Sequence, residues 1–490
     1  MKRYFLLALL SAAFLIVACS KDEPAASSSE PPVDPPVSGS TFGRALRSLD
    51  IVARVDTIIP VQNPAGYNEL YRVSFTQPVD HNNPSAGTFR QKAFLFYVGP
   101  DRPTVLYTCG YILYDAYSQR PFIDLAYNMN ANLLMVEHRY FGDSKPANDS
   151  RWDYLTLGQA AADHHAIIQA LKPLLPKEWV STGTSKDGMT SLFLRYFYPD
   201  DIDVTTAFCA PFINSLSYLP IGRYLLEQSG TEEERSQVAT LLERLFEDGE
   251  NGIYTRCLQK LEERHITGDF TYNWYVHECL AYFFSFFSYQ TPATRELPSL
   301  YSTDNQLINL IFASTLQQED YSFIYPYCIQ CAKELGQFIY DYDHYAYLLD
   351  STAFDLAAVR QNPSDLHPED VWLYSTYDSA ILSDIRANFI PNTSSPILFV
   401  YAKDDPWTGA RPDRINELSS KLIINPIGVH NHDINNPEHF SLETRNEIMD
   451  FIAQYVAYRT DPVVAKRPPI SIFHEMKDQF MIHYALRVNG

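Results

Sequence analysis

Residues 179–198 constrain the fold of this chain more than any other segment, because they place a Gly-x-Ser turn between an apolar stretch and a helical pattern. The apolar stretch runs into Val180, Gly183 and Ser185 follow, and the helical pattern continues to Tyr198. A serine on such a strand-to-helix turn has its hydroxyl exposed above the sheet. The segment predicts strand, turn and helix, and it makes Ser185 a candidate nucleophile. The alternative is a serine in an ordinary turn.

The residues beside Ser185 fit a tight turn at two positions and depart from it at a third. Gly183 and Gly188 are small, as close backbone packing requires. Asp187 stands where the usual motif has a glycine. A carboxylate at this position would distort the turn or alter the basicity of a nearby histidine. It therefore favours the alternative of a site without turnover.

Three short apolar runs predict buried strands that end in loops, and helical patterns lie between them. The runs are Thr104–Thr108, Asn132–Val136 and Pro396–Tyr401, and Thr156–Leu171 has helical periodicity. Apolar runs without alternation are typical of strands that are covered on both faces. Strands that alternate with helices predict an α/β fold with a mainly parallel sheet.

The middle of the chain differs from this pattern. Residues 213–385 show no clear strand, Thr231–Glu263 is charged and helical, and Tyr272–Tyr289 is dense in aromatic residues that we interpret mainly as core. We therefore predict a helical cap inserted into a sheet domain. The predicted parts are a signal peptide (1–18), a tether (19–41), the first part of the sheet domain (42–212), the cap (213–385) and the second part of the sheet domain (386–490).

The N-terminus predicts export and a lipid anchor. Lys2 and Arg3 precede an apolar run, Phe5–Val17, that is too short to span a bilayer, and Cys19 ends a lipobox-like sequence. We expect lipidation at Cys19, and Ser20 favours an outer-membrane lipoprotein in the cell envelope, periplasmic or surface-exposed. The polar residues that follow predict the tether. An ordinary secretory signal is the alternative.

Charge and cysteine content limit the partners. The net charge of −21 argues against nucleic acid or anionic lipid as a partner, so the lipid anchor is the one membrane contact expected. We expect no metal and no cofactor. Six cysteines remain after Cys19, and an even number in an exported protein predicts at least one disulfide, with the pairing open.

A base and an acid are needed to activate a serine, and the last third of the chain offers both. Asp405 follows the apolar run that ends at Tyr401, and His430 follows a second apolar run. Active-site loops gather at this end of the strands in a parallel sheet. The order Ser185, Asp405, His430 is that of a catalytic triad in an α/β-hydrolase fold. His432 is the alternative base, two residues further on.

Several motifs resemble those of a family of serine peptidases. They are Gln77–His81 with Gly87–Phe89, Glu137–Ser144, Gly183–Met189, Asp405–Trp407 and His430–Ile434. Together they resemble the bacterial secreted tripeptidyl aminopeptidases and the related prolyl carboxypeptidase and dipeptidyl peptidase II group. The resemblance implies an α/β-hydrolase fold with a helical cap. It also implies a serine exopeptidase that removes tri- or dipeptides from free N-termini of peptide substrates.

The resemblance and the motifs also assign roles to single residues. Ser185 is expected to be the nucleophile, His430 the base and Asp405 the orienting acid. The oxyanion is expected to bind the N–H of Lys186 and a second N–H from Gly110 or Tyr111. Glu137 is expected to bind the substrate amino group, with an ion pair to Arg139 as the alternative.

Two other functions stay open at this point. One is an esterase or lipase on the same fold, because triad geometry does not set the acyl substrate. The other is a non-catalytic surface lipoprotein that binds peptides, which Asp187 favours and the intact acid and histidine disfavour. The sequence leaves open the length of the released peptide, the residue preference, the disulfide pairing and the oligomeric state.

Overall fold

The computed structural model describes residues 40–119, 123–146, 152–247, 249–317, 324–349, 353–356, 366–431 and 433–458. The predicted signal peptide, Cys19 and all but the last two residues of the predicted tether lie outside these ranges, as does His432. The described chain begins with helix α1 (Thr41–Arg47).

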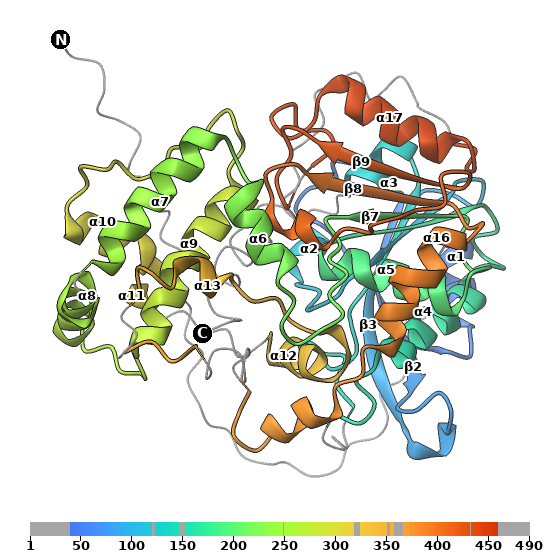
Figure 1. Ribbon diagram of the computed structural model, residues 1–490. Coiled ribbons are helices and arrows are strands. Elements are labelled where there is room, and N and C mark those ends of the chain that lie inside the picture. Colours follow the sequence, from blue (N-terminus) through green and yellow to red (C-terminus); the bar gives the residue numbers. More distant parts are fainter. Residues whose placement is uncertain are drawn as a thin grey trace. The chain divides into compact units, whose positions relative to one another are not determined.

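A nine-stranded sheet forms the centre of the fold (Figure 1). The strands are β1 (Val52–Thr57), β2 (Glu69–Pro78), β3 (Thr88–Tyr97), β4 (Thr104–Thr108), β5 (Asn132–Val136), β6 (Trp179–Thr184), β7 (Val204–Phe208), β8 (Ile397–Ala402) and β9 (Ser420–Asn425). Their order is β1-β2-β3-β5-β4-β6-β7-β8-β9. The pairs from β1 to β3 and the pair β3–β5 are antiparallel, and all later pairs are parallel. The three strands predicted from apolar runs are confirmed as β4, β5 and β8.

Helices cover both faces of the sheet. The helices of the sheet domain after α1 are α2 (Ala116–Gln119), α3 (Asp124–Met129), α4 (Leu157–Leu171), α5 (Lys186–Phe197) and α17 (Leu442–Ala453), with short turns η1 (Pro84–Ala86) and η7 (Pro406–Ala410). Val400 packs on the face covered by α3 and α17, and its neighbour Phe399 packs on the face covered by α4 and α5. This alternation explains why the strands are apolar throughout. The chain has the α/β-hydrolase fold that the sequence predicted.

The segment between β7 and β8 is helical, as predicted. We call residues 213–385 the helical insertion. Its helices are α6 (Pro220–Glu227), α7 (Glu232–Phe246), η2 (Gly249–Asn251), α8 (Ile253–Glu263), α9 (Tyr272–Tyr289), α10 (Asp304–Ile311), α11 (Ala313–Gln317), α12 (Tyr325–Gln330), η4 (Cys331–Leu335), α13 (Tyr342–Tyr345), η5 (Val371–Thr376) and α15 (Ala380–Asp384). Two further short helices, η6 (Ile385–Phe389) and α16 (Ile390–Asn392), lead into β8. The exact limits of the insertion remain a prediction.

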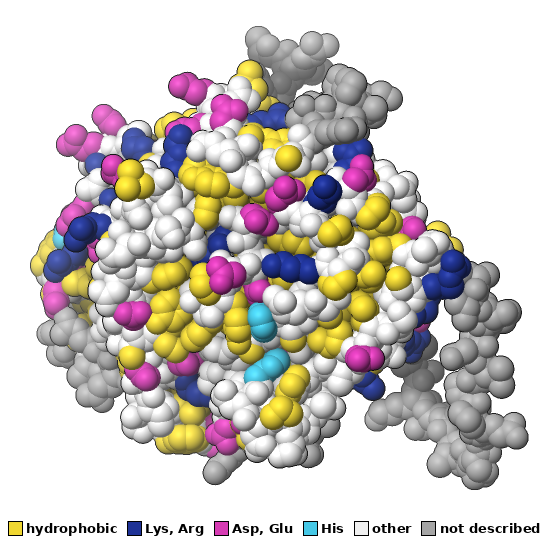
Figure 2. All heavy atoms as spheres, turned by 90° about the vertical axis from the view of Figure 1, so that its right-hand side faces the viewer, with side chains coloured by type: hydrophobic (Ala, Val, Ile, Leu, Met, Phe, Trp, Pro, Cys, Tyr) yellow, Lys and Arg dark blue, Asp and Glu magenta, His cyan; other side chains and the backbone are white. Residues whose placement is uncertain are grey.

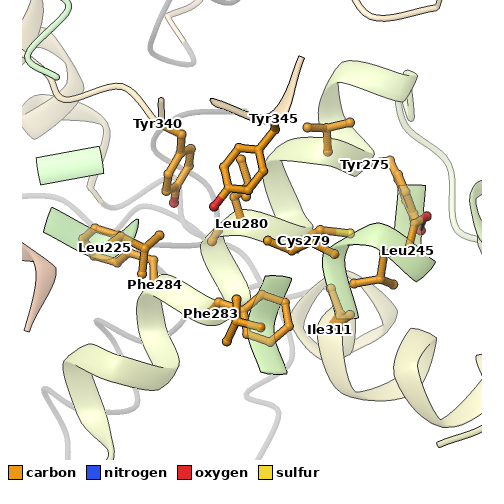
Figure 3. Close-up of a cluster of buried hydrophobic side chains, with 14 of the residues drawn as sticks. Leu225, Leu245, Tyr275, Cys279, Leu280, Phe283, Phe284, Ile311, Tyr340 and Tyr345 are labelled. Carbon is orange, nitrogen blue, oxygen red and sulfur yellow. Dashed lines mark hydrogen bonds between the residues drawn. The ribbon is translucent and has the colours of Figure 1, made fainter. Parts of the chain in front are cut away.

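The aromatic helix α9 supplies the core of the insertion (Figure 3). Its buried residues Tyr275, Leu280 and Phe284 pack with side chains from α6, α7 and α10 and with Tyr340. Thr231 caps the N-terminus of α7 in a capping box with Glu234, which satisfies two backbone donors at once. Most aromatic residues of α9 are therefore core, in agreement with the sequence-based interpretation.

The disulfide prediction is wrong for the described residues. All six cysteines that follow Cys19 are buried, and none of them is in a disulfide. Cys279 packs in the core of the insertion, and Cys109 packs in a core cluster of the sheet domain while its thiol donates to the carbonyls of Tyr111 and Ile112. An even cysteine count therefore reflected core packing and not cross-linking.

Surface charge and helix apolarity limit which partners this chain can bind. On the face shown in Figure 2, Lys and Arg side chains are interspersed with Asp and Glu among apolar groups, so the negative net charge is not gathered there in one field. Within the described ranges, no helix has the length and apolarity needed to cross a membrane.

Candidate active site

Ser185 lies on the turn between β6 and α5 with the strained backbone that the motif requires. Its φ is 60° and its ψ is −128°, and its N–H donates to the Phe208 carbonyl on β7 at 2.8 Å. A non-glycine residue rarely has a positive φ, and such strain is typical of a catalytic nucleophile on this turn. The side chain of Ser185 is buried, so the surrounding residues exclude most solvent from it.

The close packing of the turn explains its glycine. A Cβ atom on Gly183 would lie 2.4 Å from the Asp187 carbonyl carbon, which is too close for any residue other than glycine. The predicted need for a small residue at this position is therefore confirmed, and the turn accommodates Asp187 without losing its geometry.

Asp405 and His430 form a fully buried hydrogen-bonded pair. His430 Nδ1 lies 2.7 Å from Asp405 Oδ2, and both side chains are excluded from solvent. Asp405 also accepts the N–H of Trp407 at 3.3 Å, which caps the turn η7. His430 Nε2 is buried and has no hydrogen-bond partner among the described residues. One ring nitrogen is thus held by the carboxylate and the other is available for a proton.

Two contacts bring this pair to the serine turn. Phe208 accepts the Ser185 N–H, and the next residue, Cys209, has its sulfur within 4.8 Å of ligand atoms of Asp405 and His430. These three side chains are the one group with metal-ligand spacing among the described residues. Since Asp405 and His430 already bind each other, the group has the arrangement of a hydrogen-bonded acid–histidine pair beside a thiol.

The helical insertion contributes to the same site, which sequence reasoning missed. Ser288 on α9 donates to Asp405 Oδ1 at 2.9 Å, and the Tyr289 ring lies edge-on to His430 with 5.8 Å between ring centroids. The Trp407 ring, on η7 of the sheet domain, also packs against His430, with 5.7 Å between ring centroids. The density of aromatic residues in 272–289 was a signal for this helix, but no motif marked Ser288.

The predicted oxyanion loop is bound on both sides by the residues after Ser185. Gly110 N–H donates to Asp187 Oδ1 at 2.7 Å, and Lys186 Nζ donates to the Gly110 carbonyl. Asp187 Oδ2 also accepts the Tyr107 hydroxyl. The Gly110 N–H is therefore engaged by Asp187, which does not agree with a role as oxyanion donor. Tyr111 remains as the predicted second donor.

Lys186 is buried at the same place. Its ammonium lies 5.0 Å from the centre of the Tyr111 ring, 4.9 Å from that of Phe141 and 5.8 Å from that of Tyr327. Cation–π contacts of this kind are strong when they are desolvated. A positive charge thus lies beside the backbone that the prediction assigns to oxyanion binding.

Glu137 has the contacts of a structural residue. Its carboxylate accepts the N–H of Leu113 at 3.0 Å, the N–H of Asp143 at 3.0 Å and the Ser144 hydroxyl at 2.7 Å. Burial raises the pKa of the Glu137 carboxyl, although these hydrogen bonds oppose the shift. The substrate-binding role that we predicted for Glu137 has no support in these contacts.

Arg139 does not pair with Glu137, so that alternative is also wrong. Arg139 binds Asp163 on α4 through two bonds of 2.7 Å, and it donates to the carbonyls of Pro78 and Val79. His81 lies 2.8 Å from the same Asp163 carboxylate. Two of the family-like motifs, around residues 77–81 and 137–144, therefore build one buried network that joins β2, β5 and α4.

Comparison with known proteins places this geometry in a family. Residues 47–479 match the family model described as PS-10 peptidase S37. The prolyl tri/tetrapeptidyl aminopeptidase of Streptomyces mobaraensis is 28% identical over 354 residues, which cover 70% of this chain and 71% of that protein. The human lysosomal Pro-X carboxypeptidase is 28% identical over 206 residues, which cover 37% of this chain and 39% of that protein. The resemblance indicated by the sequence motifs is confirmed.

A comparison of structures gives distant similarities. The proline iminopeptidase of Mycobacterium smegmatis superposes over 78% of this chain and 98% of its own, with 14% identity and a TM-score of 0.35.

Proposed function

Since this chain belongs to the PS-10 peptidase S37 family, we propose that it is a serine exopeptidase that releases tri- or dipeptides from the free N-termini of peptides, with Ser185, His430 and Asp405 as its triad. The observation that carries the proposal is the buried Asp405–His430 pair, in which His430 Nε2 has no hydrogen-bond partner among the described residues, together with the strained backbone of Ser185. The relative from Streptomyces mobaraensis, a prolyl tri/tetrapeptidyl aminopeptidase, supports the release of short N-terminal peptides.

The proposed reaction is acyl transfer through the serine. Ser185 Oγ attacks the scissile carbonyl while His430 Nε2 takes the hydroxyl proton, and Asp405 stabilises the imidazolium that forms. His430 then gives the proton to the leaving amine. In the second half of the reaction water attacks the acyl-enzyme, with His430 taking the proton of the water and returning it to Ser185 Oγ as the peptide leaves. The proposed oxyanion donors are the N–H groups of Lys186, at the start of α5, and of Tyr111. No metal or cofactor takes part in this scheme.

Two readouts test the proposal together. A fluorophosphonate should label the protein at Ser185, and Ser185→Ala should remove both the label and the activity. A panel of aminoacyl, dipeptidyl and tripeptidyl fluorogenic amides should show its highest kcat/KM on a tri- or dipeptidyl amide with a free amino group. Equal cleavage of N-acetylated peptides would overturn the aminopeptidase assignment, and the absence of any label at Ser185 would favour a peptide-binding protein.

We also propose that the mature protein is a lipoprotein of the cell envelope, anchored through Cys19. The lipobox-like sequence before Cys19 and the polar residues after it support this location. Radiolabelled palmitate should be incorporated into the wild-type protein and not into Cys19→Ala, which should be released or remain unprocessed. Incorporation into Cys19→Ala would contradict the assignment.

A further inference from the structure

The turn that carries the acid of the triad is bound by the helical insertion at three consecutive residues. The Tyr224 hydroxyl on α6 donates to the Lys403 carbonyl at 2.7 Å, and Arg295 Nη1 donates to Asp404 Oδ2 at 2.7 Å. Ser288 Oγ on α9 donates to Asp405 Oδ1 at 2.9 Å. Residues far away in the sequence thus fix the position of this turn.

Ser288 contacts both members of the catalytic pair. Its hydroxyl donates to the Asp405 carboxylate, and its backbone carbonyl accepts the backbone N–H of His430 at 2.7 Å. This carbonyl is available because the last four carbonyls of a helix have no partner within it, and α9 ends at Tyr289. Ser288 is fully buried, so water cannot replace either contact.

The Ser288 hydroxyl helps to fix the orientation of the Asp405 carboxylate. Oδ2 of this carboxylate binds His430 Nδ1, and Oδ1 accepts the Ser288 hydroxyl and the Trp407 N–H. The Trp407 contact is long at 3.3 Å, whereas the Ser288 contact is 2.9 Å. A carboxylate held at both oxygens keeps the imidazole in one orientation and one tautomer, which a triad requires.

Arg295 makes the contact between the insertion and the acid turn a rigid one. Its guanidinium binds both oxygens of Glu234 at 2.6 Å, and it also binds Asp404. The Arg295 side chain is 2% exposed and that of Asp404 is 7% exposed, so the Arg295–Asp404 ion pair is largely desolvated. Charge-assisted bonds with this geometry are among the strongest side-chain contacts.

We propose that Ser288 is a positioning residue for the Asp405–His430 pair, and that the helical insertion is a working part of the catalytic centre and not only a cover over it. This inference rests on the proposed triad. It predicts that a substitution confined to the insertion, far from Ser185 in the sequence, lowers the rate of the chemical step without altering substrate binding.

The experiment compares Ser288→Ala with Ser285→Ala, a matched change at a second buried serine one turn earlier on α9. A hydrogen bond to a charged group corresponds to roughly a ten- to hundredfold change in rate. For Ser288→Ala we expect kcat and the rate of fluorophosphonate labelling to fall by about that factor, with KM within about twofold. Ser285→Ala should leave both rates near those of the wild type. Ser288→Thr, which keeps the hydroxyl, should recover most of the loss.

The outcomes separate the inference from the proposed function. If Ser185 is labelled and Ser288→Ala is as active as Ser285→Ala, the inference is wrong while the triad stands. If Ser288→Ala and Ser288→Thr lose the same activity with equal drops in melting temperature, the loss reflects packing and the inference is also wrong. If wild-type protein is not labelled at Ser185, the triad itself fails and the inference fails with it.

Discussion

Asp187 is the residue at which this chain departs from the motif around Ser185, the proposed nucleophile, and its contacts give the departure a role. Its carboxylate accepts the N–H of Gly110 and the hydroxyl of Tyr107, so it holds the loop after β4 against the start of α5. A Cβ atom on Gly110 would lie 2.9 Å from this carboxylate, which shows how closely the two segments approach. Asp187 therefore holds the loop in place without distorting the serine turn.

We predict that Asp187→Ala lowers kcat by about ten- to hundredfold, because the loop that carries Tyr111 loses a charge-assisted hydrogen bond. Asp187→Asn keeps an acceptor for the Gly110 N–H and should stay within about tenfold of the wild type. Steady-state kinetics on the best tripeptidyl amide measures both. A faster Asp187→Ala enzyme would show instead that Asp187 blocks Gly110 as an oxyanion donor.

The identity of the base is a second prediction for single residues. His430 is bound to Asp405 through Nδ1, so His430→Ala should lower kcat by several orders of magnitude, since triad members act as a unit. His432→Ala should stay within about tenfold of the wild type, about 1.4 kcal/mol of activation barrier. The reverse pattern would move the base to His432, and small effects from both variants would argue against a triad.

At the scale of elements, the sequence predicted what local patterns control. Apolar runs marked β4, β5 and β8, and the Gly-x-Ser turn marked β6 and α5, because burial on both faces and tight turns restrict composition. The order of Ser185, Asp405 and His430 along the chain identified the candidate triad, because this order is typical of the fold. Ser288 and Arg295 escaped prediction because their role depends on the packing of α9 and the segment after it against a turn more than 100 residues away, at Asp404 and Asp405.

Predictions from the sequence were wrong where one residue type can have either a structural or a functional role. The cysteines suggested cross-links and turned out to be core residues, and Glu137 lay after a strand like a site residue although it binds its own loop. In both cases the deciding information was which partner lies opposite in space.

The buried Arg139–Asp163 pair joins several elements, and we predict that Arg139→Met destabilises the fold by about 3–5 kcal/mol. Removal of one partner leaves the other charge buried without compensation. Arg139→Lys should recover part of the loss, since lysine keeps the charge but not the two parallel bonds. Arg54→Met is the control: Arg54 pairs with Asp56 on the surface, with 72% and 45% of the side chains exposed, and its loss should cost less than about 1 kcal/mol. Urea unfolding measures all three, and equal effects at both sites would contradict the prediction.

For the whole molecule, buried titratable groups set how stability changes with pH, and they act in opposite directions. Burial lowers the pKa of four histidines, His138, His164, His277 and His439. These stay neutral in the folded protein, so stability is lost as the pH falls below the unfolded value of about 6.5. Burial raises the pKa of Asp124 to about 7, with the charge of Asp433 adding to the shift, and that of Glu334 to about 6. Below these values the folded protein keeps protons that the unfolded chain releases from about pH 4 upward, so the stability that these carboxyls contribute is lost as the pH rises through the folded-state values.

His277 allows the histidine part of this balance to be measured alone. Burial lowers its pKa to about 3, and neither ring nitrogen has a hydrogen-bond partner among the described residues. At pH 4.5 the unfolded chain binds a proton that folded His277 does not, which costs about 2–3 kcal/mol of stability. We predict that His277→Met, a change of similar volume, increases the free energy of unfolding at pH 4.5 by about 2–3 kcal/mol more than at pH 7.5. The exposed His344→Met should show no such difference between the two pH values. Urea unfolding at both pH values provides the comparison, and an equal effect of His277→Met at both would mean that His277 is not the acid-sensitive group.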